Sequence, residues 1–266
     1  MLTMYQQADI SVYVQGIKDA AEQGDVYAQY NLGLMFVKGH GVEQDYVMAA
    51  LWLCKAAQQD HACAKFYLGN LYYNGHSIKQ DYAAAAEWFR MAAEQGHMEA
   101  QHNLGVMYED GKGVAHNYLI AYYWYSKAAE QGHVEAQKKL GNLYYNGHGV
   151  KQDYAAAVKW FRMAAEQGNA KAQNNLGMMY KNGQGAAQNY GAAIQWLTKA
   201  AEQGYAVAQY NLGTMYYEAH NLLQAHIWLN LAATSKNTTD HHIERKMTSE
   251  QIKVSQKLSR EWLQKH

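Results

Sequence analysis

Apolar residues recur at helical spacing along most of the chain. In the stretch AKFYLGNLYYNG, Phe66, Leu68 and Leu71 follow each other at intervals of two and three residues, which favours a helix with one buried face. Asn74-Gly75 then stops this helix. A polar turn and a second apolar run follow, so the pattern predicts two antiparallel helices joined by a turn.

This pattern returns every 36 residues. An Ala followed, after three residues, by Leu-Gly begins at residues 28, 64, 100, 136, 172 and 208. Residues 68–96 and 140–168 are near copies that differ at only four positions. Because an active site needs each catalytic group once, repetition on this scale points first to architecture. Six helical hairpins stacked in series predict an all-α fold, an α-solenoid.

Turn and cap residues support the hairpin. Side-chain oxygens suited to N-capping precede the second helices at Asp45, Asp81, Asn117, Asp153 and Asn189. Paired turn glycines stand between the helices at Gly39/Gly41, Gly111/Gly113 and Gly147/Gly149. Glycines suited to the position after a helix are Gly24, Gly96, Gly132, Gly168 and Gly204. The chain has no Pro that would interrupt a helix.

The repeat pattern divides the chain into four parts. We expect an N-terminal segment with a capping helix at 1–27, six repeats at 28–233, a polar loop at 234–247 and a C-terminal capping helix at 248–266. Thr248 and Gln251 have the spacing of a capping box at the start of that last helix. In repeat six the first and second helices are four residues closer, so the turn at His220-Asn221 should be tighter.

One position of the second helix is always Trp. It holds Trp52, Trp88, Trp124, Trp160, Trp196 and Trp228, and an Ala pair follows each of them. A large ring beside two small residues suits interlocked helices, so we interpret these rings as core. A platform for ligand stacking is the alternative, but the uniformity of the position favours packing.

Composition narrows the possible partners. Lys+Arg and Asp+Glu number 23 each, so the chain lacks the basic excess typical of nucleic-acid binding. No apolar run approaches the ~20 residues that span a bilayer, and the first residues lack a signal-peptide pattern. We expect no nucleic-acid partner and no membrane insertion. The cytoplasm is the default location, with the periplasm or secretion as alternatives if a signal peptide was removed.

Candidate catalytic and metal sites are weak. The motifs G-x-S-x-G, S-x-x-K and H-E-x-x-H are absent, as are phosphate and dinucleotide fingerprints. Of the thirteen histidines, His40, His76 and His148 share one position of the repeat and His61, His97 and His133 another. Equivalent residues of stacked repeats lie ~10 Å apart, too far to share one Zn²⁺. We therefore expect exposed turn histidines, no metal, no cofactor and no enzyme activity.

Two cysteines, Cys54 and Cys63, are nine residues apart. Other repeats have polar or charged residues at most of the equivalent positions, so we expect two free thiols. A disulfide remains the alternative if the protein is exported.

At this point the repeat resembles a known family. The pattern A-x-x-x-L-G-x-M-Y-x-x-G-x-G-V-x-x-D-Y-x-x-A-x-x-W-x-x-x-A-A-E-Q-G is similar to the Sel1-like repeat, a relative of the tetratricopeptide repeat. The resemblance covers 28–233. It implies a right-handed superhelix whose first helices line a concave side, and an adaptor that holds protein partners.

The resemblance also implies which positions face a ligand. Counted from the Gly of Leu-Gly, they lie at −6, −3, +1, +4 and +5. We expect a partner to bind at Tyr27, Tyr30, Phe66, Tyr73, Glu99, His102, Glu109, Lys138, Tyr145, Lys171, Asn174, Lys181, Tyr210 and Tyr217. At +5, Asn74, Asn146 and Asn182 are interpreted instead as helix-end residues. Relaxed surface variation is the alternative explanation for this diversity.

The sequence thus favours a monomeric, non-enzymatic adaptor that binds a protein or peptide in its groove. A structural or immunity-type protein that binds a folded partner by edge loops or ends is the runner-up. A hydrolase-like enzyme stands third.

Overall fold

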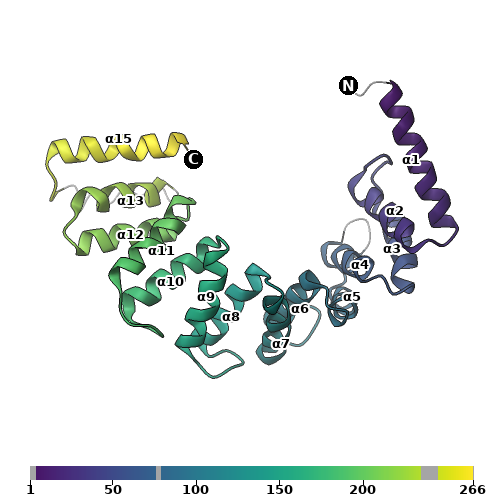
Figure 1. Ribbon diagram of the computed structural model, residues 1–266, viewed down its shortest axis with the longest axis horizontal. Coiled ribbons are helices and arrows are strands. Elements are labelled where there is room, and N and C mark those ends of the chain that lie inside the picture. The colour runs from purple at the N-terminus through teal and green to yellow at the C-terminus, as the bar shows by residue number, and fades with distance from the viewer. Residues whose placement is uncertain (1–3, 76–78, 235–244, 266) are drawn as a thin grey trace. The chain divides into compact units, whose positions relative to one another are not determined.

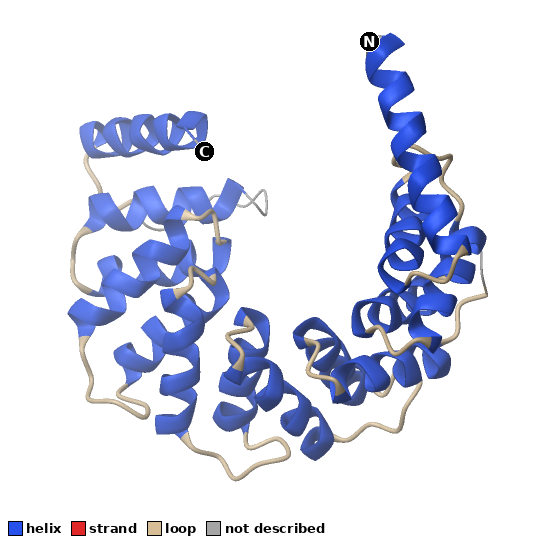
Figure 2. Cartoon of the chain, turned by 45° about the vertical axis from the view of Figure 1, so that its right-hand side comes forward, coloured by secondary structure: helices blue, strands red, loops and turns tan. Residues whose placement is uncertain are grey.

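The computed structural model describes residues 4–75, 79–234 and 245–265. Over these ranges it contains fourteen helices and no strand (Figure 2). The helices are α1 (Met4–Glu22), α2 (Val26–Lys38), α3 (Tyr46–Gln58), α4 (Ala62–Asn74), α5 (Tyr82–Glu94), α6 (Met98–Asp110), α7 (Tyr118–Glu130), α8 (Val134–Asn146), α9 (Tyr154–Glu166), α10 (Ala170–Asn182), α11 (Tyr190–Glu202), α12 (Ala206–Glu218), α13 (Leu222–Thr234) and α15 (Ser249–Lys265).

The helices form two compact units, residues 1–136 and 137–266. In the first unit α2 packs on α3, α4 on α5 and α6 on α7, and α1 covers α2. In the second unit α10 packs on α11 and α12 on α13, and α15 lies against α13 (Figure 1). Each unit is a stack of helical hairpins with contacts between successive hairpins. The predicted class, an all-α solenoid of six repeats, is confirmed.

The predicted caps define the ends of the helices. Asp45 accepts hydrogen bonds from the backbone amides of Val47 and Met48 at 2.8 and 3.0 Å, which pairs two amides that the first turn leaves free. The residues Asp81, Asn117, Asp153 and Asn189 cap their helices in the same way. Gly39 ends α2 with a φ of 67°, a left-handed conformation that suits glycine.

The glycine of each Leu-Gly pair lies where the two helices of a hairpin touch. A Cβ on Gly105 would lie 2.7 Å from two ring carbons of Tyr125, which is closer than van der Waals contact allows. Equivalent close approaches join Gly33 to Leu53, Gly69 to Phe89, Gly141 to Phe161, Gly177 to Leu197 and Gly213 to Leu229. The predicted contact face of the first helix is therefore confirmed.

The core position of the second helix is the residue after the Trp. Tyr125 and Phe89 are at most 1% exposed. Among the tryptophans only Trp52 is buried, and the other five of that position are half-buried. Trp88 packs against a cluster formed by α3 of the preceding hairpin and α4 of its own, and Trp124 and Trp228 pack against equivalent clusters. The interpretation as core is thus confirmed for Trp52, while these three half-buried rings lie beside clusters shared by consecutive hairpins.

The C-terminal end of the repeat array is built by local hydrogen bonds. The capping box is confirmed, because Thr248 accepts from the backbone amide of Gln251 at 3.2 Å and Gln251 accepts from that of Thr248 at 2.9 Å. The short turn before α13 places His220 at a φ of 61°. Asn221 then caps α13 by accepting from the amide of Gln224 at 3.2 Å.

Histidines cap three of the first helices, which corrects their interpretation as exposed turn residues. The Nδ1 atoms of His61, His97 and His133 accept from backbone amides three residues later, at 3.2, 3.3 and 3.1 Å. These rings are partly buried, whereas His40 and His148 are exposed. His76 lies outside the described residues.

These caps make stability depend on pH. Burial lowers the pKa of all three imidazoles, and Nδ1 accepts a hydrogen bond only when it carries no proton. Their contribution is therefore complete above the unfolded pKa of ~6.5 and is lost as the pH falls through the lowered folded values. Each cap contributes about 1 kcal/mol.

The test replaces all three histidines with Asn, which caps the equivalent helix α10 at position 169. We expect the parent's melting temperature to fall between pH 7.5 and pH 5 and that of His61→Asn/His97→Asn/His133→Asn to fall less, as measured by circular dichroism. Equal losses in the two proteins would show that other groups cause the pH dependence.

Candidate binding pockets

The predicted partner-binding residues differ widely in exposure. Four are exposed, namely Tyr27, Glu99, Lys171 and Tyr210. Eight are half-buried, namely Tyr30, Phe66, Tyr73, His102, Glu109, Tyr145, Lys181 and Tyr217. The remaining two, Lys138 and Asn174, are buried. Their positions on the first helices therefore do not by themselves make them accessible.

Three rings at the −3 position make contacts between repeats, while their role in binding a partner stays a prediction. Tyr30 stacks on His61 with ring centroids 4.5 Å apart. Phe66 stacks on His97 in the same way, also at 4.5 Å. His102 stacks on His133 at 4.4 Å. In each case the ring covers the histidine that caps the first helix of the following repeat. Removing the ring should therefore weaken the fold as well as any binding.

Asn174 and Lys138, two other residues of the −3 position, are buried. Asn174 accepts a hydrogen bond from Asn211 at 2.8 Å and donates one to Asn175 at 3.3 Å. Asn175 in turn donates to Asn142 at 3.4 Å. Asn174 thus belongs to a network across α8, α10 and α12. Lys138 is only 9% exposed, so little of its surface is open to a partner.

Several charged candidates already have partners within the chain. Glu109 accepts a hydrogen bond from the hydroxyl of Tyr125. The ammonium of Lys181 lies 2.9 Å from the carboxylate of Glu218. Binding a charged partner at these residues would require such contacts to be replaced, which reduces what the new contact can contribute.

A pocket of about 220 Å³ opens between α4, α5 and α6. We call it the first pocket. Its lining residues are Asn70, Tyr73, Asn74, Phe89, Asn103 and Val106. Tyr73 is held by an edge-to-face contact with Tyr82, with ring centroids 5.1 Å apart. Asparagine amides surround an apolar wall in which Phe89 is 1% exposed.

A second pocket, of about 280 Å³, lies between α8, α9 and α10. Its lining residues are Asn142, Tyr145, Asn146, Phe161, Asn175, Met178, Met179 and Gln184. Tyr145 makes the equivalent edge-to-face contact, with Tyr154 at 5.3 Å. Each residue of the first pocket has its counterpart 72 positions later in the second pocket.

Sequence reasoning found only part of these pockets. Tyr73 and Tyr145 were predicted as contact residues and line the pockets. Asn74 and Asn146 are the last residues of α4 and α8, as interpreted, and they also line the pockets. Asn70 and Asn103 were not predicted. Counted from the Gly of Leu-Gly, they lie at +1 on one first helix and at −2 on the first helix of the following repeat, a pair of positions that the sequence does show.

The described residues show no other chemical centre. No group of three His, Cys, Asp or Glu side chains in these ranges lies together as metal ligands would. Cys54 and Cys63 are free thiols, as expected. Among the described helices, none has both the length and the apolar character needed to cross a bilayer.

The stacked helical hairpins form an α-solenoid, with polar and aromatic pockets between their first helices. Solenoids of this kind typically mediate protein–protein interactions. The chain belongs to the Sel1 repeat family. The family's repeat model matches residues 26–61, 64–97, 99–133, 134–169, 170–205 and 206–237.

Two solved structures share this fold. One is c5321, described as a protective antigen of uropathogenic Escherichia coli with an SLR fold, with 34% identity and a TM-score of 0.85. The match covers 95% of this chain but 57% of that protein's length. The other is a Sel1 repeat protein from Oxalobacter formigenes, with 32% identity, a TM-score of 0.78 and coverage of 87% of this chain and 98% of that one. A search of the curated proteins found no match.

Proposed function

We propose that this chain is a non-enzymatic, monomeric scaffold that binds an extended segment of another protein between its first helices. The observation that supports this proposal is the pair of pockets lined by asparagine amides and aromatic rings. An amide side chain can both donate to and accept from a peptide group. The aromatic walls can bury one apolar side chain of the same segment.

The size of the pockets favours this class of ligand. At about 220 and 280 Å³, they lie below the ~300–1,000 Å³ typical of sites for small molecules and cofactors. A single side chain with its adjoining peptide group is a better match. The exposed rings of Tyr27 and Tyr210 offer further contact area on first helices of the array.

Site-specific photo-crosslinking tests the proposal. A photoreactive phenylalanine analogue at Tyr73 or Tyr145 is expected to crosslink, in native lysate, to one short segment of a partner, which mass spectrometry of the digested product identifies. The same analogue at Glu87, an exposed residue of α5, is the matched control and is expected to give no such product.

The edge-binding alternative makes a different prediction. A folded partner held by the turns would crosslink from His40 and His148, which are exposed between first and second helices. Crosslinks from these turns alone, with none from Tyr73 or Tyr145, would replace the peptide-scaffold proposal with the immunity-type or structural one.

A further inference from the structure

The two pockets are near copies of one site. Phe89 and Phe161 form equivalent walls, Tyr73 and Tyr145 equivalent edges, and an asparagine occupies each of three further equivalent positions. The one substitution in the shared lining replaces Val106 with Met178, which is another apolar side chain. Two sites with the same walls and the same hydrogen-bonding groups should select the same ligand.

The fold alone does not require this identity. In repeat five the positions of Tyr73 and Phe89 hold Lys181 and Leu197. In repeat one the position of Asn70 holds Leu34. Hairpins of the same geometry thus carry other linings, so the repeated set of side chains is a property of repeats two and four in particular.

The near copies differ at two positions that the structure describes in both copies, and both lie away from the pocket lining. Two further differences, Ser77/Gly149 and Ile78/Val150, include residues outside the described ranges. The two described differences are Ala86/Val158, which is buried, and Glu87/Lys159, which is exposed. Neither of these two differences lines either pocket.

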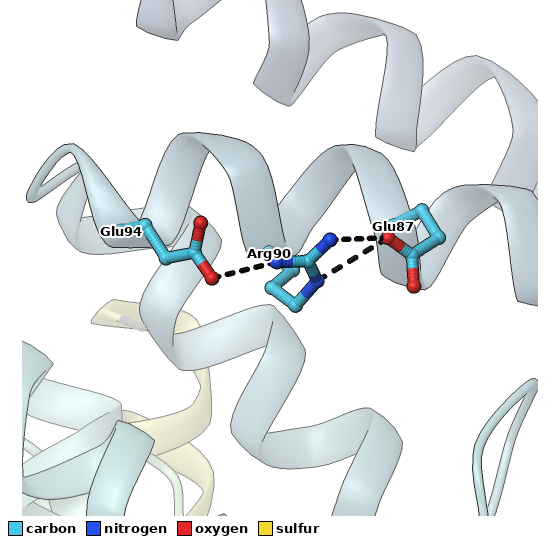
Figure 3. Close-up of polar contacts among 3 residues, drawn as sticks. All are labelled: Glu87, Arg90 and Glu94. Atoms are coloured by element: carbon cyan, nitrogen blue, oxygen red, sulfur yellow. Dashed lines mark hydrogen bonds and ion pairs between the residues drawn. The ribbon is translucent and has the colours of Figure 1, made fainter.

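The exchange of Glu87 for Lys159 rearranges the outer surface. In α5, Arg90 pairs with Glu87 and Glu94, at 2.7 Å each (Figure 3). In α9, Arg162 instead donates to the hydroxyl of Tyr180 at 2.5 Å. The outer surfaces of the two copies therefore carry different charges and contacts, while five of the six residues that line the first pocket recur unchanged in the second.

The rims of the two pockets carry different side chains: a pair of opposite charges at the first pocket and two uncharged amides at the second. The net charge of these side chains is zero in both cases. Near the first pocket the ammonium of Lys112 donates to the hydroxyl of Tyr73 at 3.3 Å and lies 3.6 Å from the carboxylate of Asp110. At the equivalent positions the second copy has Gln184 and Asn182. Because no residue that lines either pocket is charged, the ligand segment should be uncharged.

We propose that the chain is bivalent and that both pockets take the same uncharged segment. The inference rests on the proposed function and names the ligand class: an extended peptide with one apolar or aromatic side chain beside Tyr73 and Val106 in the first pocket, or Tyr145 and Met178 in the second. Its main-chain N–H and C=O groups pair with the amides of Asn70 and Asn103, or of Asn142 and Asn175. The natural partner then carries the segment twice or binds as two copies.

The test begins with a probe that needs no knowledge of the partner. A displayed library of random seven-residue peptides is selected on the whole chain, and the tightest-binding peptide is measured by isothermal titration calorimetry. We expect two equivalents of peptide per chain, with two dissociation constants within about tenfold of each other. A single equivalent would overturn bivalency.

Matched variants assign the two equivalents to the two pockets. Asn70→Ala and Asn142→Ala are each expected to reduce the stoichiometry from two to one, and the double variant should bind none. Tyr73→Ala and Tyr145→Ala form a second matched pair, in case an asparagine variant fails to fold, and melting curves identify such failures. Loss of both equivalents in one folded single-pocket variant would overturn the assignment.

A tandem peptide measures the consequence of bivalency. Two copies joined by Gly-Ser linkers of increasing length should bind at least about a hundredfold more tightly at the best length, because the second contact becomes intramolecular. Either single-pocket variant should abolish this gain. No gain at any length would contradict a partner that carries the segment twice on one chain.

The two proposals fail in different ways. If selected peptides bind one pocket only, the peptide-scaffold function stands and bivalency fails. If no selected peptide depends on any of the four pocket residues Asn70, Tyr73, Asn142 and Tyr145, both the proposed function and the bivalent inference fail.

Discussion

Gly105→Leu is expected to lower the free energy of unfolding by roughly 1–3 kcal/mol, the usual cost of overpacking a close-packed core. Even the Cβ of such a side chain would lie 2.7 Å from the ring of Tyr125. That ring is fully buried between the helices of its hairpin, so it has little room to move. Gly105→Ala should destabilise the fold in the same direction.

Gly16→Ala provides the matched control, because a Cβ on Gly16 would meet nothing within 4 Å. An exposed Gly in a helix costs about 1 kcal/mol relative to Ala, so this variant should be more stable than the parent. Urea denaturation followed by circular dichroism measures both variants. If Gly105→Ala is as stable as Gly16→Ala, the close approach of α6 and α7 is not a constraint on stability.

The helices and their ends could be predicted from sequence because the interactions that set them are local. Asp45 and Val47 are two residues apart, and the capping box joins Thr248 to Gln251. Such signals lie within one turn of a helix, where spacing alone decides which groups meet. The repeat period then placed the six hairpins in order.

Contacts between hairpins were harder to predict, because they depend on the rotation of each helix about its axis. Helix side chains one residue apart point about 100° apart, so a shift of one position moves a residue from the centre of the core to its edge. This is why Trp124 was interpreted as core, whereas Tyr125 is the fully buried residue. Stacking of Phe66 on His97 likewise joins side chains of different repeats.

The candidate site was found in part for the same reason. Tyr73 stands out in sequence as an aromatic residue at a variable position, and it does line a pocket. Asn74 looked like an ordinary residue before a helix-ending glycine. Its place beside Asn103 of the next repeat becomes visible only when the first helices are stacked.

A hydrogen-bond ladder between repeats, also missed from sequence, leads to the second large effect. Gln101 donates to the carbonyl of Ala93 in the preceding repeat at 3.0 Å and accepts from Gln131 of its own repeat at 2.7 Å. Repeat two departs from this arrangement. There Lys65 replaces the glutamine and donates to Asp60, which also accepts from Gln95 at 2.5 Å.

Asp60 also replaces the glycine that other repeats have after the second helix, and its φ is 68°. A left-handed conformation is unfavourable for most residues other than glycine. The Lys65 side chain is 4% exposed while that of Asp60 is 79% exposed. Asp60 therefore supplies a carboxylate to the buried ammonium of Lys65. The cost is backbone strain at Asp60 itself.

We expect Asp60→Gly to lower the melting temperature, because it relieves the strain but leaves the ammonium of Lys65 buried without its carboxylate, a costly arrangement. Adding Lys65→Gln should reverse the loss, because the new glutamine can bond the carbonyl of Ala57 and the amide of Gln95 as the ladder does elsewhere. The double variant should therefore melt at or above the parent's temperature, although one of its changes is harmful alone.

A double-mutant cycle by thermal denaturation measures this dependence. Lys65→Gln alone is the fourth corner, and it should be milder than Asp60→Gly because exposed Asp60 remains solvated without its partner. Additive effects across the cycle would show that Lys65 and Asp60 do not act as a unit. Nonadditivity in the expected direction would mean that Lys65 and Asp60 act as a unit, since Asp60→Gly alone leaves the buried ammonium of Lys65 without its partner.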